Sequence, residues 1–182
     1  MRSEIAFASL ALFAMTAPGT ASAQAETLQA GAGQAGVGQA GVDYAGFVEL
    51  AGELGEYRQS RLLGWEEWDR QSRLHGAIIL DTRSAAAFAQ GHIRGAVNLP
   101  FSDFTEDKLA QIIADRQRPV FIYCNNNFAD DEPPVPLKRL ELALNIPTFI
   151  NLYGYGYRNI AELGEVVALD DVDWVSPELR AQ

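Results

Sequence analysis

The sequence predicts an α/β fold with a mainly parallel sheet that is covered by helices on both faces. Short runs of β-branched and aromatic residues, such as VFIY at 120–123, have the composition of buried strands. Segments with apolar residues at helical spacing separate these runs. This alternation is typical of parallel strands joined through crossover helices.

The first half of the chain alternates helical and strand patterns. FVELAGEL, which begins at Phe47, places Phe47, Leu50 and Leu54 on one side of a short amphipathic helix. AIIL and AVNL are apolar runs of the length and composition of buried strands. The elements expected here are helices from Asp43, at Trp65 to Leu74 and at Ser84 to Gln90, and strands at 77–80 and 96–99.

The second half continues the alternation and ends in a polar tail. Leu109, Ile112 and Ile113 recur at helical spacing, whereas VFIY and TFINL are strand-like. The tail DDVDWVSPELRAQ is polar, and we expect it to pack only through Trp174. The elements expected in this half are helices at 104–116, 137–144 and 157–166, and strands at 120–123 and 148–152.

Both ends of the chain differ in composition from its centre. An apolar stretch from Ile5 to Ala17 precedes Ala21-Ser22-Ala23, the small-x-small pattern of a signal peptidase site. The Gly-Gln-Ala-Gly repeats that follow are typical of a flexible linker. We therefore expect a signal peptide at 1–23, a linker at 24–46, one domain at 47–175 and a polar tail at 176–182. The predicted location is periplasmic or secreted.

The charge balance restricts the kinds of partner. The formal net charge is -10 and the sequence pI is about 4.6. Nucleic acids and anionic membrane surfaces attract basic faces, so we expect neither nucleic-acid binding nor membrane binding after signal cleavage. A chain of 182 residues fits one domain with extensions.

The single cysteine, Cys124, follows the run VFIY and therefore lies at the carboxyl end of a predicted strand. Sites in open α/β sheets are built at that edge. One cysteine cannot form an intramolecular disulfide, so the thiol is either a small buried hydrophobe or a reactive group. The strand pattern alone leaves both interpretations open.

Several motifs together resemble one family. ILDTRS at 79–84 and AFAQGHIRGAVNLP at 87–100 are similar to the first blocks of rhodanese-like domains. The strand that ends in Cys124 and the later NLYGYGYRNI continue the resemblance, which covers about residues 60 to 168. It implies a five-stranded, mainly parallel sheet with helices on both faces. It also implies a sulfurtransferase that carries sulfur as a persulfide of Cys124, with thiosulfate or another sulfane-sulfur donor.

The partners implied are a small sulfur donor and a thiol or cyanide-type acceptor, with a protein partner as a further candidate. No cofactor is expected. Asn125, Asn126 and Asn127 tolerate turn conformations and supply amide donors for a sulfur-binding loop. Lys138 and Arg139, at the start of the expected helix, are candidates for binding the anionic substrate. Asp81 and Arg83 are expected to pin their loop by hydrogen bonds, without a catalytic role.

The loop from Asn125 to Pro136 departs from the short loop typical of active members. It carries Asp130, Asp131 and Glu132, which we expect to raise the pKa of the thiol if they face it. Its prolines predict a stiff segment. The alternative function is therefore a catalytically weak binding module that uses loop 125–136 to bind a protein or small ligand.

Other cysteine chemistry fits the sequence less well. A tyrosine-phosphatase site needs an arginine six residues after its cysteine, where this chain has Asp130. No feature places His75 or His92 beside Cys124 as a papain-like partner. The acids after Cys124 lack the spacing and histidines of a metal site, so we expect no metal.

Overall fold

The computed structural model describes residues 41–176. The predicted signal peptide, residues 24–40 of the predicted linker and the end of the tail lie outside the described residues. Within them, helix α1 (Tyr44–Glu53) begins after Asp43, whose carboxylate accepts a hydrogen bond from the Gly46 amide at 2.8 Å. This helix thus begins three residues before the predicted start of the domain at residue 47.

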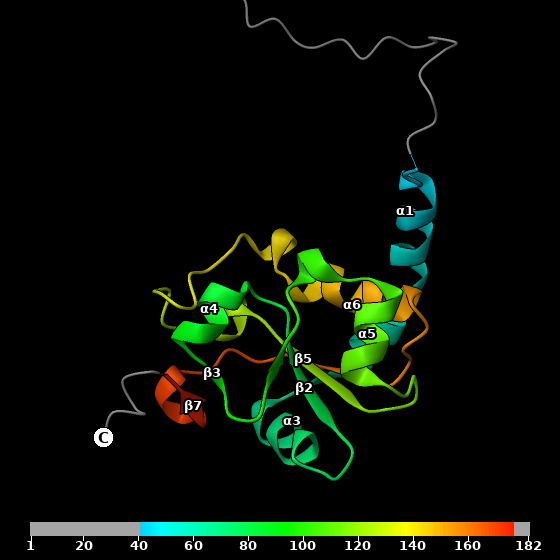
Figure 1. Cartoon of the computed structure of the whole chain (residues 1–182). Coiled ribbons are helices and arrows are strands. Elements are labelled where there is room, and N and C mark those ends of the chain that lie inside the picture. Colours follow the sequence, from blue (N-terminus) through cyan, green and yellow to red (C-terminus); the bar gives the residue numbers. More distant parts are fainter. Residues whose placement is uncertain (1–40, 177–182) are drawn as a thin grey trace, which may run out of the picture. The chain divides into compact units, whose positions relative to one another are not determined.

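A five-stranded parallel sheet forms the centre of the domain (Figure 1), which confirms the predicted fold class. Its strand order is β1-β6-β5-β2-β4, and each neighbouring pair is parallel. Every residue of its three central strands is buried, as expected for a sheet covered on both faces. The strands are β1 (Leu62–Leu63), β2 (Ile78–Asp81), β4 (Val97–Asn98), β5 (Val120–Tyr123) and β6 (Ile160–Leu163).

Helices connect the strands and cover both faces of the sheet. Helix α4 (Ala85–Gln90) is capped by the Ser84 hydroxyl and α5 (Glu106–Ile113) by the Thr105 hydroxyl, each at 3.2 Å from a backbone amide. Ala114 adopts a φ of 64°, which ends α5 before the predicted Arg116. The remaining helices are α2 (Gly55–Gln59), α3 (Trp65–Ser72) and α6 (Asn145–Gly154). No helix among residues 41–176 is long and apolar enough to cross a membrane.

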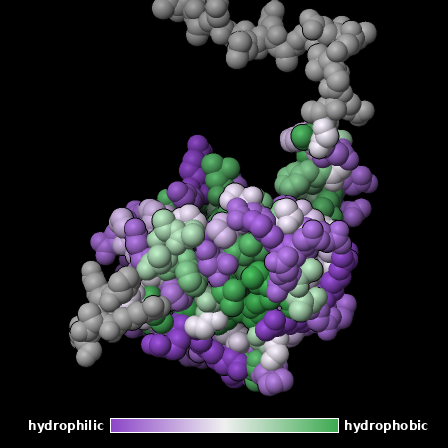
Figure 2. All heavy atoms as spheres, in the orientation of Figure 1, coloured by the Kyte–Doolittle hydropathy of each residue, from purple (hydrophilic) through white to green (hydrophobic). Residues whose placement is uncertain are grey.

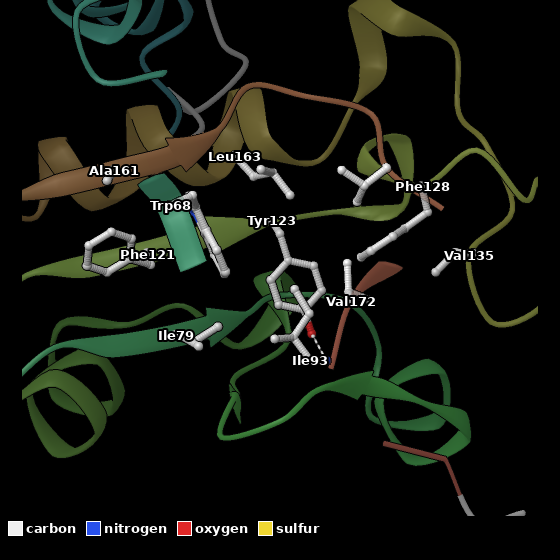
Figure 3. Close-up of a cluster of buried hydrophobic side chains, with 11 residues drawn as sticks. Trp68, Ile79, Ile93, Phe121, Tyr123, Phe128, Val135, Ala161, Leu163 and Val172 are labelled. Carbon is white, nitrogen blue, oxygen red and sulfur yellow. Dashed lines mark hydrogen bonds between the residues drawn. The ribbon is translucent and has the colours of Figure 1, made fainter. Parts of the chain in front are cut away.

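Two hydrophobic clusters fill the two faces of the sheet. Alternate residues of the strands point to opposite faces, so Ile79, Phe121 and Leu163 join one cluster while Leu80, Ile122 and Ile160 join the other. Figure 3 shows the first cluster, in which the ring of Trp68 from α3 lies against the rings of Phe121 and Tyr123 from β5. The second cluster packs the sheet against α5 and α6.

The C-terminal tail makes more contacts than predicted. Strand β7 (Trp174–Val175) pairs antiparallel with β3 (His92–Ile93), so the expectation that only Trp174 packs is wrong. Val172 and Val175 are buried beside it. A Cβ at Gly91 would overlap the indole of Trp174, so glycine lets the tail approach α4 closely.

Three predicted elements near the end of the chain are wrong. TFINL lies in helix α6, and the predicted last helix contains strand β6. The predicted helix at 137–144 is an extended loop with one 3-10 turn, η3 (Leu140–Leu142).

The physical reason is that tertiary contacts outweigh local propensity. In α6 the buried residues Asn145, Thr148, Phe149 and Leu152 have helical spacing, but two of them are polar and hide the pattern. In β6, Ala161 and Glu162 favour a helix locally. The place beside β5 in the sheet fixes them as a strand.

Candidate functional site

The site lies where β2 and β5 end at the same edge of the sheet. Asp81, the last residue of β2, pairs in register with Tyr123, the last residue of β5. Cys124 follows directly and continues the extended backbone, with φ of -144° and ψ of -176°. The predicted position of the thiol at the carboxyl end of a strand is therefore confirmed.

The thiol lies in the wall of a cavity of about 370 Å³. Cys124 is only 2% exposed. The polar residues of the lining are Arg83, Ser84, Asn125, Asn126 and Lys138, and the apolar ones are Ala87, Pro134, Pro136, Leu142 and Leu144. The cavity thus joins the cysteine to the long loop that follows it.

Backbone amides from two segments converge on the sulfur, and we call them the amide cradle: the N–H groups of Asn126, Asn127, Leu144 and Asn145. The Asn127 amide donates to the thiol within the turn η2 (Asn125–Asn127), while Asn145 is the first residue of α6. Burial raises the pKa of Cys124, whereas the amides of Asn145, Asn126 and Leu144 act in the opposite direction, and the net shift is upward. The cradle favours an anionic sulfur in a site that otherwise disfavours charge.

The side chain of Asn127 joins the two halves of the cradle. Its Oδ1 accepts from the Cys124 amide at 2.9 Å and from Nδ2 of Asn145 at 3.0 Å. Its Nδ2 donates to the carbonyl oxygens of Leu163 at 2.8 Å and Glu165 at 3.1 Å. Because Asn127 is 6% exposed and does not line the cavity, its contacts support the site from behind.

Asn125 and Asn126 hold the loop over the thiol. The side-chain amide of Asn125 donates a hydrogen bond to the Pro136 carbonyl at 2.9 Å. Asn126 exchanges two hydrogen bonds with the backbone of Lys138, at 2.7 and 3.1 Å. These bonds bring Lys138 to the cavity, although it does not begin a helix as predicted.

Arg139 is placed differently from Lys138. Its side chain is 81% exposed, lies 3.9 Å from a carboxylate oxygen of Glu141 and does not line the cavity. The sequence predicted that both residues lie at the start of a helix at 137–144, but the structure does not contain this helix. Only Lys138 of the two is therefore brought to Cys124.

Asp81 and Arg83 form a buried ion pair beside the cavity. The Nη2 atom of Arg83 lies 2.6 Å from Oδ2 of Asp81, and the two side chains are 3% and 0% exposed. Arg83 also donates to the carbonyls of Gly91 at 2.7 Å and Pro134 at 3.2 Å. Burial raises the pKa of Tyr123, whose hydroxyl donates to Asp81 at 2.5 Å. Arg83 thus ties three segments together while one side of it lines the cavity.

The acids of the loop do not face the thiol. Oδ2 of Asp130 accepts from the Leu169 amide at 3.0 Å, and Oδ1 of Asp131 accepts from the Leu137 amide at 2.9 Å. None of Asp130, Asp131 and Glu132 lines the cavity or contributes to the raised pKa of Cys124. The condition under which these acids would raise that pKa is therefore not met, because two of them accept hydrogen bonds from other backbone amides.

The acid that does oppose a thiolate is Glu162, which was not among the residues predicted from the sequence. It pairs in register with Ile122 on β5, so its side chain and that of Cys124, two residues further, lie on the same face of the sheet. Arg58 holds it by two hydrogen bonds of 2.7 and 2.5 Å. Burial raises the pKa of Glu162 although Arg58 favours its charged form. A charged residue inside a short apolar run was the available signal, but that run was interpreted as a helix.

The other candidate chemistries find no support in the geometry. Nδ1 of His92 lies 2.8 Å from the Phe88 carbonyl, and its ring stacks on Phe88 at 3.8 Å. No group of three metal-ligating side chains occurs within residues 41–176.

Comparisons with known proteins agree with the resemblance in the sequence. The family model described as rhodanese-like domain matches residues 63–162. No curated protein matched the chain.

Similar solved structures are distant in sequence. The BH2092 protein from Bacillus halodurans is 19% identical, with a TM-score of 0.43, and the match covers 64% of this chain and 74% of that one. A rhodanese with anions from E. coli is 22% identical, with a TM-score of 0.36, covering 54% of this chain and 96% of that one. The rhodanese-like domain of the Alr3790 protein from Anabaena sp. is 19% identical, with a TM-score of 0.43, covering 64% and 79%.

Proposed function

The chain belongs to the rhodanese-like domain family, and from that premise we propose that it transfers sulfane sulfur through a persulfide of Cys124. The observation that carries the proposal is the amide cradle. Backbone N–H groups from η2 and from the start of α6 converge on the one thiol that lies in the wall of a cavity. Such a cradle suits a sulfur atom that is anionic before and after transfer.

The reaction has two balanced steps. The thiolate of Cys124 attacks the sulfane sulfur of the donor, an S–S bond forms, and the donor leaves as its anion with the electron pair of the broken bond. An acceptor thiolate or cyanide then attacks the outer sulfur and restores the Cys124 thiolate. The outer sulfur carries negative charge between the steps, and the Lys138 side chain on the cavity wall favours that charge.

The raised pKa of Cys124 sets the expected pH dependence. Only the thiolate attacks the donor, and burial keeps the thiol protonated above its ordinary pKa. Persulfide formation should therefore accelerate as the pH rises through the ordinary range of a thiol and should level off above it. A rate that is constant across this range contradicts thiolate attack as the controlling step.

A specific observation also favours the alternative, a binding module that uses loop 125–136. Three leucines that follow this loop directly, Leu137, Leu140 and Leu142, are 44%, 78% and 69% exposed, whereas the thiol is buried. At the upper edge of the coloured surface in Figure 2, to the left of α1, hydrophobic residues stand beside hydrophilic ones. An exposed apolar rim of this kind suits contact with a partner.

Mass spectrometry separates the two functions. The protein is incubated with thiosulfate or an organic sulfane-sulfur donor, and we expect one added sulfur on the peptide that contains Cys124. The Cys124→Ser variant should gain none, because a serine hydroxyl is a far weaker nucleophile near neutral pH. A wild-type thiol that is neither persulfidated nor alkylated in the folded state rejects the enzyme and leaves the binding module.

We also propose that the protein is exported and cleaved after Ala23, which gives a periplasmic or secreted domain. The support is the apolar segment followed by Ala21-Ser22-Ala23. Amino-terminal sequencing of the purified protein should give Gln24 as its first residue. Soluble protein that retains residues 1–23 would contradict both the cleavage and the location.

A further inference from the structure

The cavity beside Cys124 has features that restrict the donor, provided that the proposed sulfur transfer is correct. Its volume of about 370 Å³ falls in the range of about 300–1,000 Å³ that is typical for small organic ligands. Thiosulfate is much smaller. Pro134, Pro136 and Leu142 from the loop, with Ala87 of α4 opposite, give the wall an apolar surface. A small dianion would leave this surface without a contact.

The charge available in the cavity is also limited. Of the two cations that line it, Arg83 is committed to both carboxylate oxygens of Asp81. Lys138 has no acidic partner within 4.0 Å among residues 41–176. Buried Glu162, on the face of the sheet that carries Cys124, opposes negative charge at the sulfur. Among the described residues, the cavity thus offers one cation outside an ion pair and an acid that opposes charge at the sulfur, which suits a donor with a single negative charge.

We propose that the preferred donor is a sulfane-sulfur anion with one negative charge and an apolar organic group, of the thiosulfonate class. In this arrangement the sulfane sulfur meets Cys124 at the amide cradle, and the organic group contacts the loop wall. Cys124 thiolate and R–SO2–S⁻ give the Cys124 persulfide anion and R–SO2⁻. The S–S bond of the donor breaks with its electron pair on the sulfinate, so no oxidant or reductant is needed.

The test compares benzenethiosulfonate, methanethiosulfonate and thiosulfate as donors. The rate of Cys124 persulfide formation is measured by mass spectrometry and divided by the rate of the same donor with a free small thiol, which removes intrinsic reactivity. Contact of the ring with the apolar wall should favour benzenethiosulfonate over each of the other donors by about tenfold. A larger normalised rate for thiosulfate overturns the donor class while leaving sulfur transfer intact.

Two pairs of variants test the apolar wall of the cavity and the positive charge of Lys138. Leu142→Asn should remove most of the preference for the benzene ring, whereas Leu74→Asn, at another exposed leucine that does not line the cavity, should leave it unchanged. Lys138→Gln should slow all three anionic donors. Lys108→Gln, at an exposed residue paired with Asp103, should not. Equal effects of both leucine variants would contradict contact between the donor and the wall.

A binding measurement tests the ligand class of the cavity without any sulfur transfer. In the Cys124→Ser protein, calorimetric titration should detect benzenesulfinate, the product anion, and should detect sulfite at least about tenfold more weakly. Stronger binding of sulfite rejects the proposed ligand class. If no donor forms a persulfide but benzenesulfinate still binds, the proposed sulfur transfer fails and the ligand class of the cavity holds.

Discussion

The ends of strands β2 and β5 lie side by side, but different interactions stabilise the segments that follow them. At the end of β2, the charges of Asp81 and Arg83 satisfy each other, and Tyr123 and two carbonyls complete the network. At the end of β5, uncharged amides gather around the sulfur of Cys124. The first arrangement is closed, whereas the second keeps donors directed at an atom on the cavity wall.

The difference shows how a purely structural network differs from a reactive site at the same edge of the sheet. A buried ion pair is costly to break because each charge then lacks a partner. An amide cradle around a thiol can accommodate a change of charge on the sulfur, because backbone donors favour the anion without being charged themselves. The four predictions that follow test this division.

The largest effect is expected for Asp81→Ala. It leaves the Arg83 guanidinium buried without its carboxylate, so we expect a loss of about 3–5 kcal/mol in the free energy of unfolding, measured by urea denaturation. Asp173→Ala is the control, because the pair of Arg94 and Asp173 is 62% and 52% exposed and should contribute about 0–1 kcal/mol. Loss of persulfide formation with unchanged stability would place Asp81 in the catalytic site.

A smaller loss of stability, together with slower chemistry, is expected for Asn127→Ala. The variant leaves the amide of Cys124 and two carbonyls without their partner, at about 1–3 kcal/mol. It also releases α6 from the cradle, so persulfide formation should slow even at temperatures where the variant is fully folded. Asn151→Ala on the same helix is the control, since Asn151 donates only to the Pro147 carbonyl. Equal rates in both folded variants would show that the cradle does not depend on Asn127.

Glu162→Gln should lower the pKa of Cys124 without abolishing the site. The Glu162 carboxylate raises that pKa, so its removal favours the thiolate and shifts the alkylation profile to lower pH. Alkylation rates across a pH series measure the shift. Glu106→Gln alters an exposed glutamate that is also paired with an arginine, and should leave the profile in place. An upward shift for Glu162→Gln would contradict the assigned electrostatics.

The smallest effect is expected for the combined substitution Asp130→Asn, Asp131→Asn and Glu132→Gln. These acids do not line the cavity, so the pH profile of Cys124 alkylation should not move. The same alkylation series measures it, with wild type as the reference. A downward shift would mean that the loop acids act on the thiol and that the first expectation from the sequence was right.

Much of the fold could be predicted from the sequence, except in the last third of the chain. The runs at 77–80 and 120–123 consist of apolar residues, most of them β-branched or aromatic, and lie at the centre of the sheet. Propensity and burial agree there, so the assignments were right to within a residue. In α6 and β6 propensity and burial disagree, so local propensity predicts a strand where α6 lies and a helix where β6 lies.

The candidate site could also be predicted only in part. The place of Cys124 at a strand end follows from VFIY alone, and Lys138 does line the cavity. The roles of Asn127 and Glu162 depend on which distant backbone lies beside them. No local pattern indicated that Asn145 begins a helix, so the second half of the amide cradle was missed.

By itself, the sequence determined the α/β class, the central strands and the location of the thiol, because these depend on composition and spacing within a few neighbouring residues. Only the tertiary structure decided which groups face that thiol. The loop acids turn toward the amides of Leu169 and Leu137, while Glu162 comes to lie on the face of the sheet that carries Cys124. Electrostatic effects on a buried sulfur depend on distance and burial, and both are set by contacts between residues far apart in the chain.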